Sequence, residues 1–475
     1  MPAKSKQSDV ALLGLAETSE LVHAKKLSPV ELTQACLARI EALNPELNAF
    51  ITVTAEMALA QARAAEAEIQ RSAWRGPLHG IPVSLKDLID VAGVPTTAAS
   101  KVFEDRVPTE DAEVVQRLKA AGAVIVGKNN LHECAYGGSG VISRYGPAKN
   151  PRYPGRITAG SSSGSAAAVA GGLCYGAIVT DTAGSIRLPA AFCGIVGFKP
   201  TYGLVSARGV MPLSWSLDHI GPMARSVTDV ALILAAIAGY DPADPTSREI
   251  AAADYAAAVR TPAPKLRVGV PRKLFYEDLD SDVARVAEGA LRVVAGLAAE
   301  TREVCVPMDN DRTVSKAETY AYHAQNVRER ADQYDPETLR RINTGADVSV
   351  RDYLARLHEL ELARRSAAEI FKDVDVVVTP TAPVPPPLLA ELQADMSRLR
   401  ERELLMLRNT RPFNVLGLPG ISVPCGETSA GLPVALQIAG PAGKDAQVLA
   451  FARGFEEKAD SSHALSRRAP SRGSE

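Results

Sequence analysis

The 475-residue sequence has few aromatic side chains, little net charge and no long apolar run, and each absence excludes a class of function. Aromatic residues make up 5% of the chain, too few for a platform that stacks the bases of a single strand. Lysine and arginine (53) nearly balance aspartate and glutamate (55), so no basic stripe is available for nucleic acid or a membrane surface. The longest small-apolar run, residues 166–179, is broken by glycines and is too short to cross a bilayer.

The sequence also lacks any C-x-x-C pair, and its first residues lack the apolar stretch of a signal peptide. Its six cysteines have mostly apolar neighbours, so we expect reduced core thiols in a cytoplasmic protein: Cys36, Cys134, Cys174, Cys193, Cys305 and Cys425. What is present is ordinary globular composition, 46% hydrophobic and 23% charged.

Short apolar runs punctuated by glycine and proline alternate with helical patterns, which predicts one α/β sheet covered by helices on both faces. Strands are expected over 49–53, 81–85, 124–126, 178–180, 268–270, 374–378, 421–423 and 434–438. Helices are expected over 55–71, 112–121, 227–238, 283–299 and 444–458, and from Ser165 through the following alanines. Ser28-Pro29 begins a further capped helix that we expect to end at Pro45.

Two serine-bearing stretches are the most informative part of the chain. Residues 158–172 read TAGSSSGSAAAVAGG, and residues 180–206 read TDTAGSIRLPAAFCGIVGFKPTYGLVS. Small hydroxyl residues flanked by core-forming runs suggest a site where the backbone packs closely. A serine nucleophile needs this arrangement of little bulk, available N–H groups and a rigid support.

A serine nucleophile requires a base, and Lys86 is the candidate. His79 and His219 lie near these motifs, but neither has an obvious aspartate partner. Lys86 follows an apolar strand and would lie at its carboxyl end, where burial lowers the pKa of a lysine from about 10.4. The alternative is a surface lysine paired with Asp87.

Two other motifs give rival interpretations. Residues 160–164 match G-x-S-x-G, which would make Ser162 the nucleophile, but that motif needs a preceding strand and the segment before it is loop-like. Residues 122–129 nearly match a phosphate-binding loop, but Asn129 replaces the Ser or Thr that holds magnesium.

Five ordered motifs resemble those of the amidase signature family of Ser-Ser-Lys hydrolases. The two serine stretches together form one of them, and the other four are GPLHGIPVSLKD (76–87), GKNNLHECAYGGSG (127–140), SLDHIGPMARSVTDVA (216–231) and LGLPGISVPCGETSAGLPVALQIAGP (416–441). The resemblance extends over residues 9–458 and is weakest over 307–372. It implies a single large domain with a central mixed, twisted sheet.

The resemblance implies a catalytic role for each of three residues. Ser185 would form the acyl-enzyme. Ser161, held after a cis peptide with Gly160, would relay a proton between Ser185 and Lys86, and Lys86 would act as the base. The oxyanion would be bound by the backbone N–H groups of Thr182, Ala183, Gly184 and Ser185.

Other residues would support this centre. The substrate would lie beside the loop Gly137, Gly138 and Ser139. Asp181 and Arg187 would form an ion pair that fixes the nucleophile loop. Ser162, Ser163 and Ser165 would be supporting serines, and Ser163 would bond the Lys86 ammonium. Ala159, Ser163 and Ala183 stand where glycine is commonest in the family, without removing a reacting group.

The expected function is that of a stand-alone serine amidase for amides, anilides or carbamates (urethanes), extending to esters. It would use no metal or cofactor, act on a small molecule rather than on nucleic acid or at a membrane, and exist as a monomer or homodimer. The first alternative is the amidase (glutaminase) subunit of a glutamine-dependent tRNA amidotransferase. A non-catalytic scaffold is the second.

The expected layout is one amidase signature domain, residues 9–458. It comprises an N-terminal helical part (9–72), a catalytic core (76–240), a helical variable insertion lining or covering the substrate mouth (307–372) and a C-terminal return to the sheet (373–458). Residues 379–387 are expected as an extended connector. Residues 1–8 and 466–475 are expected to be disordered.

Overall fold

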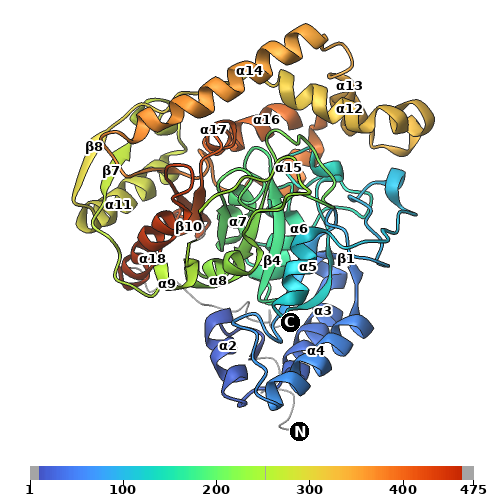
Figure 1. Ribbon diagram of the computed structural model, residues 1–475. Coiled ribbons are helices and arrows are strands. Elements are labelled where there is room, and N and C mark those ends of the chain that lie inside the picture. The colour runs from blue at the N-terminus through green and yellow to red at the C-terminus, as the bar shows by residue number, and fades with distance from the viewer. Residues whose placement is uncertain (1–9, 252, 463–475) are drawn as a thin grey trace.

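A computed structural model describes residues 10–251 and 253–462 (Figure 1). In this part of the chain eleven strands form one mixed sheet in the order β1-β3-β2-β4-β6-β5-β10-β11-β9-β7-β8, which confirms the predicted single α/β domain. The strands are β1 (Phe50–Val53), β2 (Pro82–Lys86), β3 (Val124–Asn129), β4 (Gly176–Asp181), β5 (Val196–Lys199), β6 (His219–Ala224), β7 (Arg267–Val270), β8 (Glu300–Glu303), β9 (Val376–Pro380), β10 (Gly420–Glu427) and β11 (Pro433–Ala439).

The pairing of β2 with β4 determines where the site lies. β2 runs parallel to both β3 and β4, with Leu85 opposite Ile178, whereas β6, β5, β10 and β11 are antiparallel to their neighbours. The carboxyl ends of β2 and β4 therefore meet at one edge of the sheet. Ligand sites of α/β sheets form at such an edge.

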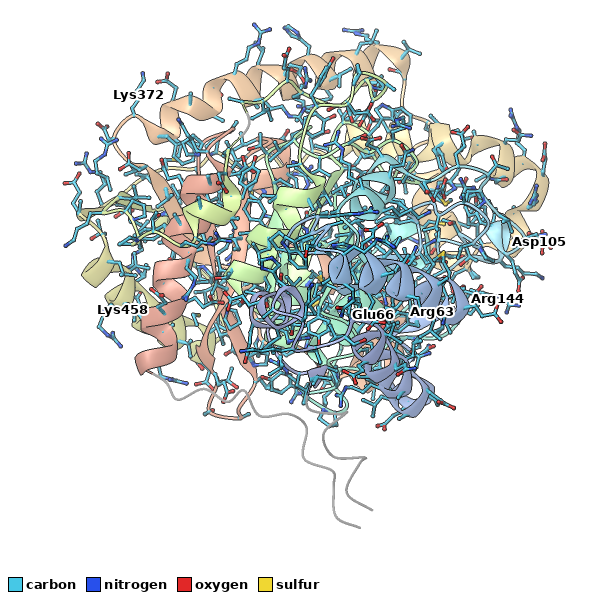
Figure 2. All side chains as sticks on the ribbon, turned by 60° about the horizontal axis from the view of Figure 1, so that its bottom comes forward. Arg63, Glu66, Asp105, Arg144, Lys372 and Lys458 are labelled. Carbon is cyan, nitrogen blue, oxygen red and sulfur yellow. The ribbon has the colours of Figure 1, made fainter. Side chains whose placement is uncertain are left out.

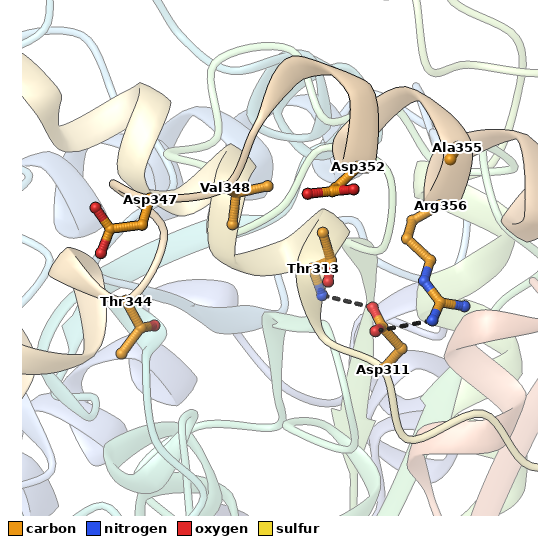
Figure 3. A pocket seen from close by; sticks show the side chains of 8 residues that line it. All are labelled: Asp311, Thr313, Thr344, Asp347, Val348, Asp352, Ala355 and Arg356. Atoms are coloured by element: carbon orange, nitrogen blue, oxygen red, sulfur yellow. Dashed lines mark hydrogen bonds and ion pairs between the residues drawn. The ribbon is translucent and has the colours of Figure 1, made fainter.

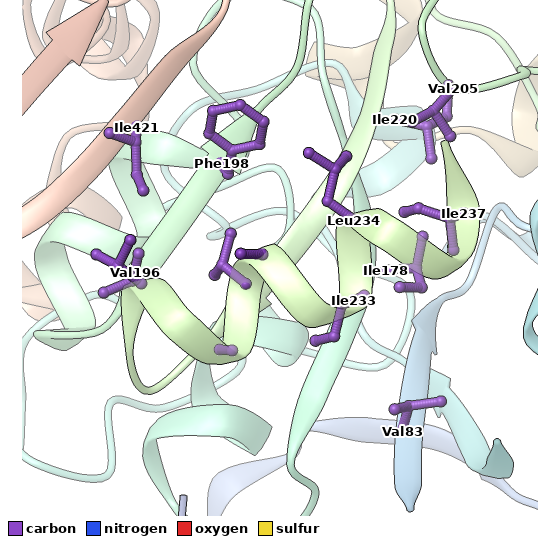
Figure 4. Packing of buried hydrophobic residues seen from close by; sticks show 14 of the residues in the cluster. Val83, Ile178, Val196, Phe198, Val205, Ile220, Ile233, Leu234, Ile237 and Ile421 are labelled. Atoms are coloured by element: carbon purple, nitrogen blue, oxygen red, sulfur yellow. The ribbon is translucent and has the colours of Figure 1, made fainter. Parts of the chain in front are cut away.

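Alternate side chains of the central strand β4 enter different hydrophobic clusters, as the two-residue period of a strand requires. In β4, Ile178 belongs to the largest cluster, whereas Ala177 and Val179 belong to a second cluster that contains residues 166–170. Figure 4 shows Ile233 and Leu234 of α8 (Val227–Ile237) among the first group of side chains. The sheet is therefore covered on both faces.

Helices α8, α11 (Ser281–Leu297) and α18 (Asp445–Ser462) pack on the face of the largest cluster. Helices α6 (Ser163–Ala170) and α7 (Arg187–Cys193) contribute side chains to the second cluster. Helices α12 (Thr313–Arg330), α13 (Pro336–Asn343) and α14 (Val350–Ser366) lie across the top of the molecule in Figure 1. The other α-helices are α2 (Leu15–His23), α3 (Pro29–Leu47), α4 (Ala55–Gln70), α5 (Glu113–Ala120), α9 (Tyr255–Ala258), α10 (Arg272–Phe275), α15 (Leu389–Ala394), α16 (Leu399–Met406) and α17 (Arg411–Val415).

Charged side chains of both signs project from widely separated parts of the surface, among them Asp105, Arg144 and Lys372 (Figure 2). This dispersal agrees with the balanced composition. Across residues 10–251 and 253–462, no helix combines the length and apolarity needed to cross a membrane.

Several expectations about the fold are wrong. The helix that begins after the Ser28 cap does not end at Pro45, but continues to Leu47, and Asn48 ends it in a left-handed conformation. Strands β5, β6 and β8 and helix α7 were not predicted. β6 contains Gly221 and Pro222, which are typical of turns, and all four residues of β8 are exposed, so neither shows an apolar pattern.

Two smaller corrections concern exposure and the proline-rich segment. Five of the cysteines are buried, but Cys305 is exposed beyond the edge strand β8. Thr379 and Pro380, predicted as connector, complete β9. Residues 1–8 and 466–475, predicted to be disordered, lie outside the described residues.

Candidate active site

Lys86 ends β2 at the edge where the parallel strands finish, and its side chain is 0% exposed. Its Nζ donates hydrogen bonds to Ser161 Oγ at 2.7 Å and to Thr180 Oγ1 at 2.8 Å. The Asp87 carboxylate accepts instead from Lys128 Nζ at 2.9 Å. The alternative of a surface lysine paired with Asp87 is therefore wrong.

Burial controls the ionisation of Lys86. Removal from water lowers its pKa from 10.5 to about 7, although the negative charges of Asp218 and Asp181 act to raise it. A large fraction of Lys86 is consequently the neutral amine at neutral pH. A neutral amine that contacts a serine hydroxyl can accept its proton.

Ser161 is positioned by backbone contacts on both sides. The Gly160–Ser161 peptide bond is cis, as the resemblance implies. Gly160 N donates to Gly138 O at 2.8 Å, and Ser161 O accepts from His132 N at 2.9 Å. A Cβ on Gly160 would lie 2.7 Å from Gly140 N, so a larger residue would push the two loops apart.

The neighbouring serines do not replace Ser161. Ser162 Oγ donates to Thr180 O at 3.4 Å, and no strand directly precedes it, so the G-x-S-x-G interpretation lacks its structural context. Ser163 Oγ is buried and has no hydrogen-bond partner among the described residues, so the expected bond to Lys86 is wrong. Thr180, which sequence reasoning missed, takes that position.

Ser185 lies in the loop that joins β4 to α7, which we call the nucleophile loop (residues 182–186). Its side chain is 6% exposed, and within the described ranges its hydroxyl makes no protein hydrogen bond. The Asp181 carboxylate accepts from Gly184 N at 2.6 Å and Ile186 N at 3.1 Å. The N–H of Gly184 is thus already occupied, which corrects its assignment to the oxyanion hole.

Three of the expected oxyanion donors remain available. The N–H groups of Thr182, Ala183 and Ser185 form no hydrogen bond with any residue that the structure describes. They follow one another around the loop, with Gly184 at φ +141° between them. A Cβ at Gly184 would lie 2.1 Å from Thr410 Oγ1, so this position needs glycine.

Asp181 and Arg187 form the expected ion pair beneath this loop. Arg187 Nη2 and Nε lie 3.0 and 3.1 Å from the two Asp181 carboxylate oxygens, and both side chains are fully buried. Burial raises the pKa of Asp181, but the Arg187 charge more than offsets this and holds the pKa well below its usual range. The pair therefore stays ionised and fixes the loop.

Distant residues complete the surroundings of Arg187. Its Nη2 donates to Asn414 Oδ1 at 2.5 Å, and its Nη1 donates to Gln437 Oε1 at 2.7 Å and Thr410 O at 2.9 Å. A buried charge is tolerated when its hydrogen bonds are satisfied in this way. Sequence reasoning missed these residues because no spacing links them to the serine motifs.

Asp218 is a further buried acid that sequence reasoning missed. Its Oδ1 accepts from Thr182 Oγ1 at 2.5 Å, and its Oδ2 accepts from Leu213 N and Ser214 N at 2.8 and 3.0 Å. Burial raises the pKa of Asp218 to about 6, against the lowering effect of these hydrogen bonds. Asp218 thus anchors the first residue of the nucleophile loop and influences Lys86 electrostatically.

The loop Gly137, Gly138 and Ser139 lies across Leu407 from the nucleophile loop. A Cβ on Gly138 would lie 2.9 Å from one Leu407 methyl group, and a Cβ on Gly184 would lie 2.8 Å from the other. Ser139 Oγ and N donate to Glu403 Oε1 at 2.6 and 3.2 Å. This loop therefore borders the group formed by Lys86 and the serines, as expected.

Neither the phosphate-loop motif nor His219 provides another centre among the described residues. Residues 124–129 are strand β3, so no phosphate-binding loop forms there. Burial holds the pKa of His219 well below its usual value, and its Nδ1 contacts Leu217 O at 2.7 Å. In the described part of the chain, no cluster of three or more His, Cys, Asp or Glu side chains could hold a metal.

Comparison with known proteins agrees with the geometry. The family model "Amidase" matches residues 31–449. The chain is 39% identical, over 94% of its length and 97% of the relative, to the A-subunit of Glutamyl-tRNA(Gln) amidotransferase from Carboxydothermus hydrogenoformans. It superposes on a structure of 6-aminohexanoate cyclic dimer hydrolase with a TM-score of 0.85 and 30% identity, covering 94% and 97% of the two chains.

It also superposes on the A-subunit of the Glutamyl-tRNA(Gln) amidotransferase from Thermotoga maritima, with a TM-score of 0.77 and 33% identity, covering 94% and 95% of the two chains. A family match over most of the chain, with relatives similar over nearly their whole length, extends well beyond the serine motifs. The chain belongs to the amidase family, whose members act on C–N bonds.

Proposed function

We propose that this chain hydrolyses an amide through an acyl-enzyme on Ser185, with Ser161 and Lys86 carrying the proton. The 2.7 Å contact between a buried lysine and the serine that follows a cis peptide supports this proposal most strongly. Lysine is an unusual base, and the lowered pKa of Lys86 suits it to accept a proton near neutral pH.

In the proposed reaction, Ser185 Oγ attacks the carbonyl carbon of the substrate. The Ser185 proton passes to Ser161, and the Ser161 proton passes to the neutral amine of Lys86. The carbonyl oxygen becomes an oxyanion that accepts from the N–H groups of Thr182, Ala183 and Ser185. The C–N bond then breaks as the relay returns the proton to the leaving nitrogen, and water hydrolyses the acyl ester by the same steps.

The similar curated proteins favour the amidotransferase alternative over a stand-alone hydrolase. Relatives named as the A-subunit of Glutamyl-tRNA(Gln) amidotransferase match 94% of the chain at 38–39% identity. On this basis the chain would hydrolyse glutamine and supply ammonia within a complex, with a protein partner and a link to tRNA.

A stand-alone hydrolase of amides, anilides or carbamates remains a second candidate, because of the structural neighbours. The TM-score is 0.85 with 6-aminohexanoate cyclic dimer hydrolase but 0.77 with the Thermotoga maritima A-subunit. The backbone is thus at least as similar to a hydrolase of a small amide as to the amidotransferase subunit.

Hydrolysis by the purified chain separates the two roles. The substrates are glutamine, primary amides, anilides, aryl carbamates and esters, tested with and without the other subunits of a bacterial glutamyl-tRNA(Gln) amidotransferase. Ammonia release from glutamine that requires those subunits supports the first role, and turnover of another amide by the chain alone supports the second. Ser185→Ala is the inactive control, and failure of every substrate in both settings would contradict the proposal.

A further inference from the structure

Glu318 of α12 is a buried carboxylate that accepts only from uncharged groups in the described part of the chain. Its side chain is 1% exposed. Oε2 accepts from Ser214 Oγ at 2.5 Å and Ser216 N at 3.1 Å, and Oε1 accepts from Ser216 Oγ and, at 3.0 Å, from Tyr353 OH. Burying a carboxylate is costly unless its hydrogen bonds are satisfied, so these four donors hold Glu318 in one place.

Three of the four hydrogen bonds come from the loop that directly precedes β6. We call residues 213–218 the Asp218 loop. Thr319, the next residue of α12, donates from Oγ1 to Leu213 O at 2.8 Å. Leu217 belongs to the same hydrophobic cluster as Val314 of α12. Polar and apolar contacts therefore fix the Asp218 loop to α12.

The fourth donor, Tyr353, brings α14 into the same contact. Figure 3 shows a second contact near the beginnings of the two helices, where Asp311 accepts from Thr313 N at 2.8 Å and lies 3.4 Å from Arg356. Glu318 does not line the pocket drawn there. It is enclosed between α12, α14 and the Asp218 loop.

The Asp218 loop connects Glu318 with the nucleophile loop. Ser214, whose hydroxyl donates to Glu318, donates its N–H to Asp218 Oδ2 at 3.0 Å, and Asp218 Oδ1 accepts from Thr182 Oγ1 at 2.5 Å. The N–H of Thr182 is one of the three donors available for the oxyanion. The orientation of this donor therefore depends on where the Asp218 loop lies.

We propose that Glu318 is a positioning residue for the oxyanion site, because it holds the Asp218 loop where Asp218 fixes Thr182. This deepens the proposed function and rests on it. Glu318 acts through Ser214 and Asp218 and not on the substrate itself. Its loss would misplace a donor that matters in the transition state, so kcat should fall while KM changes little.

A double-mutant cycle tests this connection. Thr182→Val keeps the shape of the side chain but removes its hydrogen bond to Asp218, and Glu318→Ala removes the acceptor that holds the Asp218 loop. We expect each single variant to lower kcat for the preferred amide by about ten- to hundredfold, with KM nearly unchanged. Because both act through one connection, the double variant should be no slower than the more impaired single variant.

Two matched variants separate positioning from general damage. Glu318→Gln keeps an oxygen that accepts from Ser216 N, and its NH2 group can donate to the Tyr353 hydroxyl, so it should retain most of kcat. Glu329→Ala removes an exposed glutamate of the same helix and should leave kcat unchanged. If Glu318→Ala does not fold, Ser214→Ala replaces it in the cycle, because it removes the link to Glu318 but keeps the N–H that donates to Asp218.

The same cycle, measured on the free energy of unfolding in urea, does not depend on turnover. Non-additive effects of Glu318→Ala and Thr182→Val on unfolding, with no hydrolysis of any amide, would count against the proposed function alone. In an active chain, losses of kcat that multiply in the double variant, or a kcat of Glu318→Ala equal to that of Glu329→Ala, would overturn the positioning role alone. Additive effects on unfolding in an inactive chain would overturn both.

Discussion

The ionisation of Lys86 predicts how activity depends on pH. Burial lowers its pKa from 10.5 to about 7, a difference of roughly 3.5 units, which corresponds to about 5 kcal/mol against the ammonium form in the folded protein. Only the neutral amine can accept the proton of Ser161. We therefore expect kcat/KM for an amide to rise about tenfold per pH unit below pH 7 and to level off above it.

A charge-removing variant next to Lys86 should move this profile in a known direction. Asp218 and Asp181 raise the pKa of Lys86, so Asp218→Asn should shift the midpoint of the kcat/KM profile to lower pH. Asparagine has one oxygen that can accept from Thr182 Oγ1, but its NH2 group replaces the oxygen that accepts from Leu213 N and Ser214 N, so those two hydrogen bonds are lost. Asp105→Asn, at an exposed position, is the control and should leave the midpoint unchanged.

The same pKa shift predicts the pH dependence of stability. Between about pH 7 and 10.5, Lys86 is protonated in the unfolded chain and neutral in the folded chain. The free energy of unfolding therefore increases as pH rises through this window. Below pH 7 the buried ammonium destabilises the folded state. Lys86→Met should therefore stabilise the protein more at pH 6 than at pH 10 in urea denaturation.

Two results would refute this reasoning about Lys86. A kcat/KM profile that is flat from pH 5 to 9 would show that no buried base titrates in the rate-determining step. An effect of Lys86→Met on unfolding free energy that is equal at pH 6 and pH 10 would show that the pKa of Lys86 is not lowered in the folded protein.

Ser185→Ala should abolish amide turnover and Ser161→Ala should reduce kcat nearly as much, because the relay acts as a unit. Ser162→Ala should cost far less, and the reverse order of effects would mean that the serine cluster was wrongly assigned. Arg187→Met should lower the free energy of unfolding at pH 7 by about 3–5 kcal/mol in urea denaturation, because it leaves Asp181 buried and unpaired. A loss below about 1 kcal/mol would contradict the importance of this ion pair for stability.

Local sequence patterns predicted the strands that contain an apolar run of their own. The apolar runs of β3 and β9 fill both faces of the sheet, so they appear in sequence as nearly continuous hydrophobic stretches. The polar edge strand β8 and the Gly-Pro-containing β6 exist because neighbouring strands pair with them. That information lies in tertiary structure, not in local propensity.

The residues of the candidate site also differ in whether their neighbours in the sequence identify them. Lys86, Ser161 and Ser185 lie in short motifs, so sequence alone could nominate them. Asn414 and Gln437 each contact Arg187 across more than 220 residues, and nothing in their own surroundings distinguishes them. The occupied N–H of Gly184 depends on the orientation of one carboxylate, which no sequence pattern specifies.

The long separation between Arg187 and its partners has a consequence for protein synthesis. Asn414 and Gln437 follow Arg187 in the chain by 227 and 250 residues, and a ribosome makes the chain from its N-terminus. A growing chain therefore contains Ser185 long before the side chains that surround the ion pair beneath its loop have been translated. If the chain has the proposed function, it would acquire hydrolytic competence only near the end of translation, and incomplete chains would be unable to consume amides.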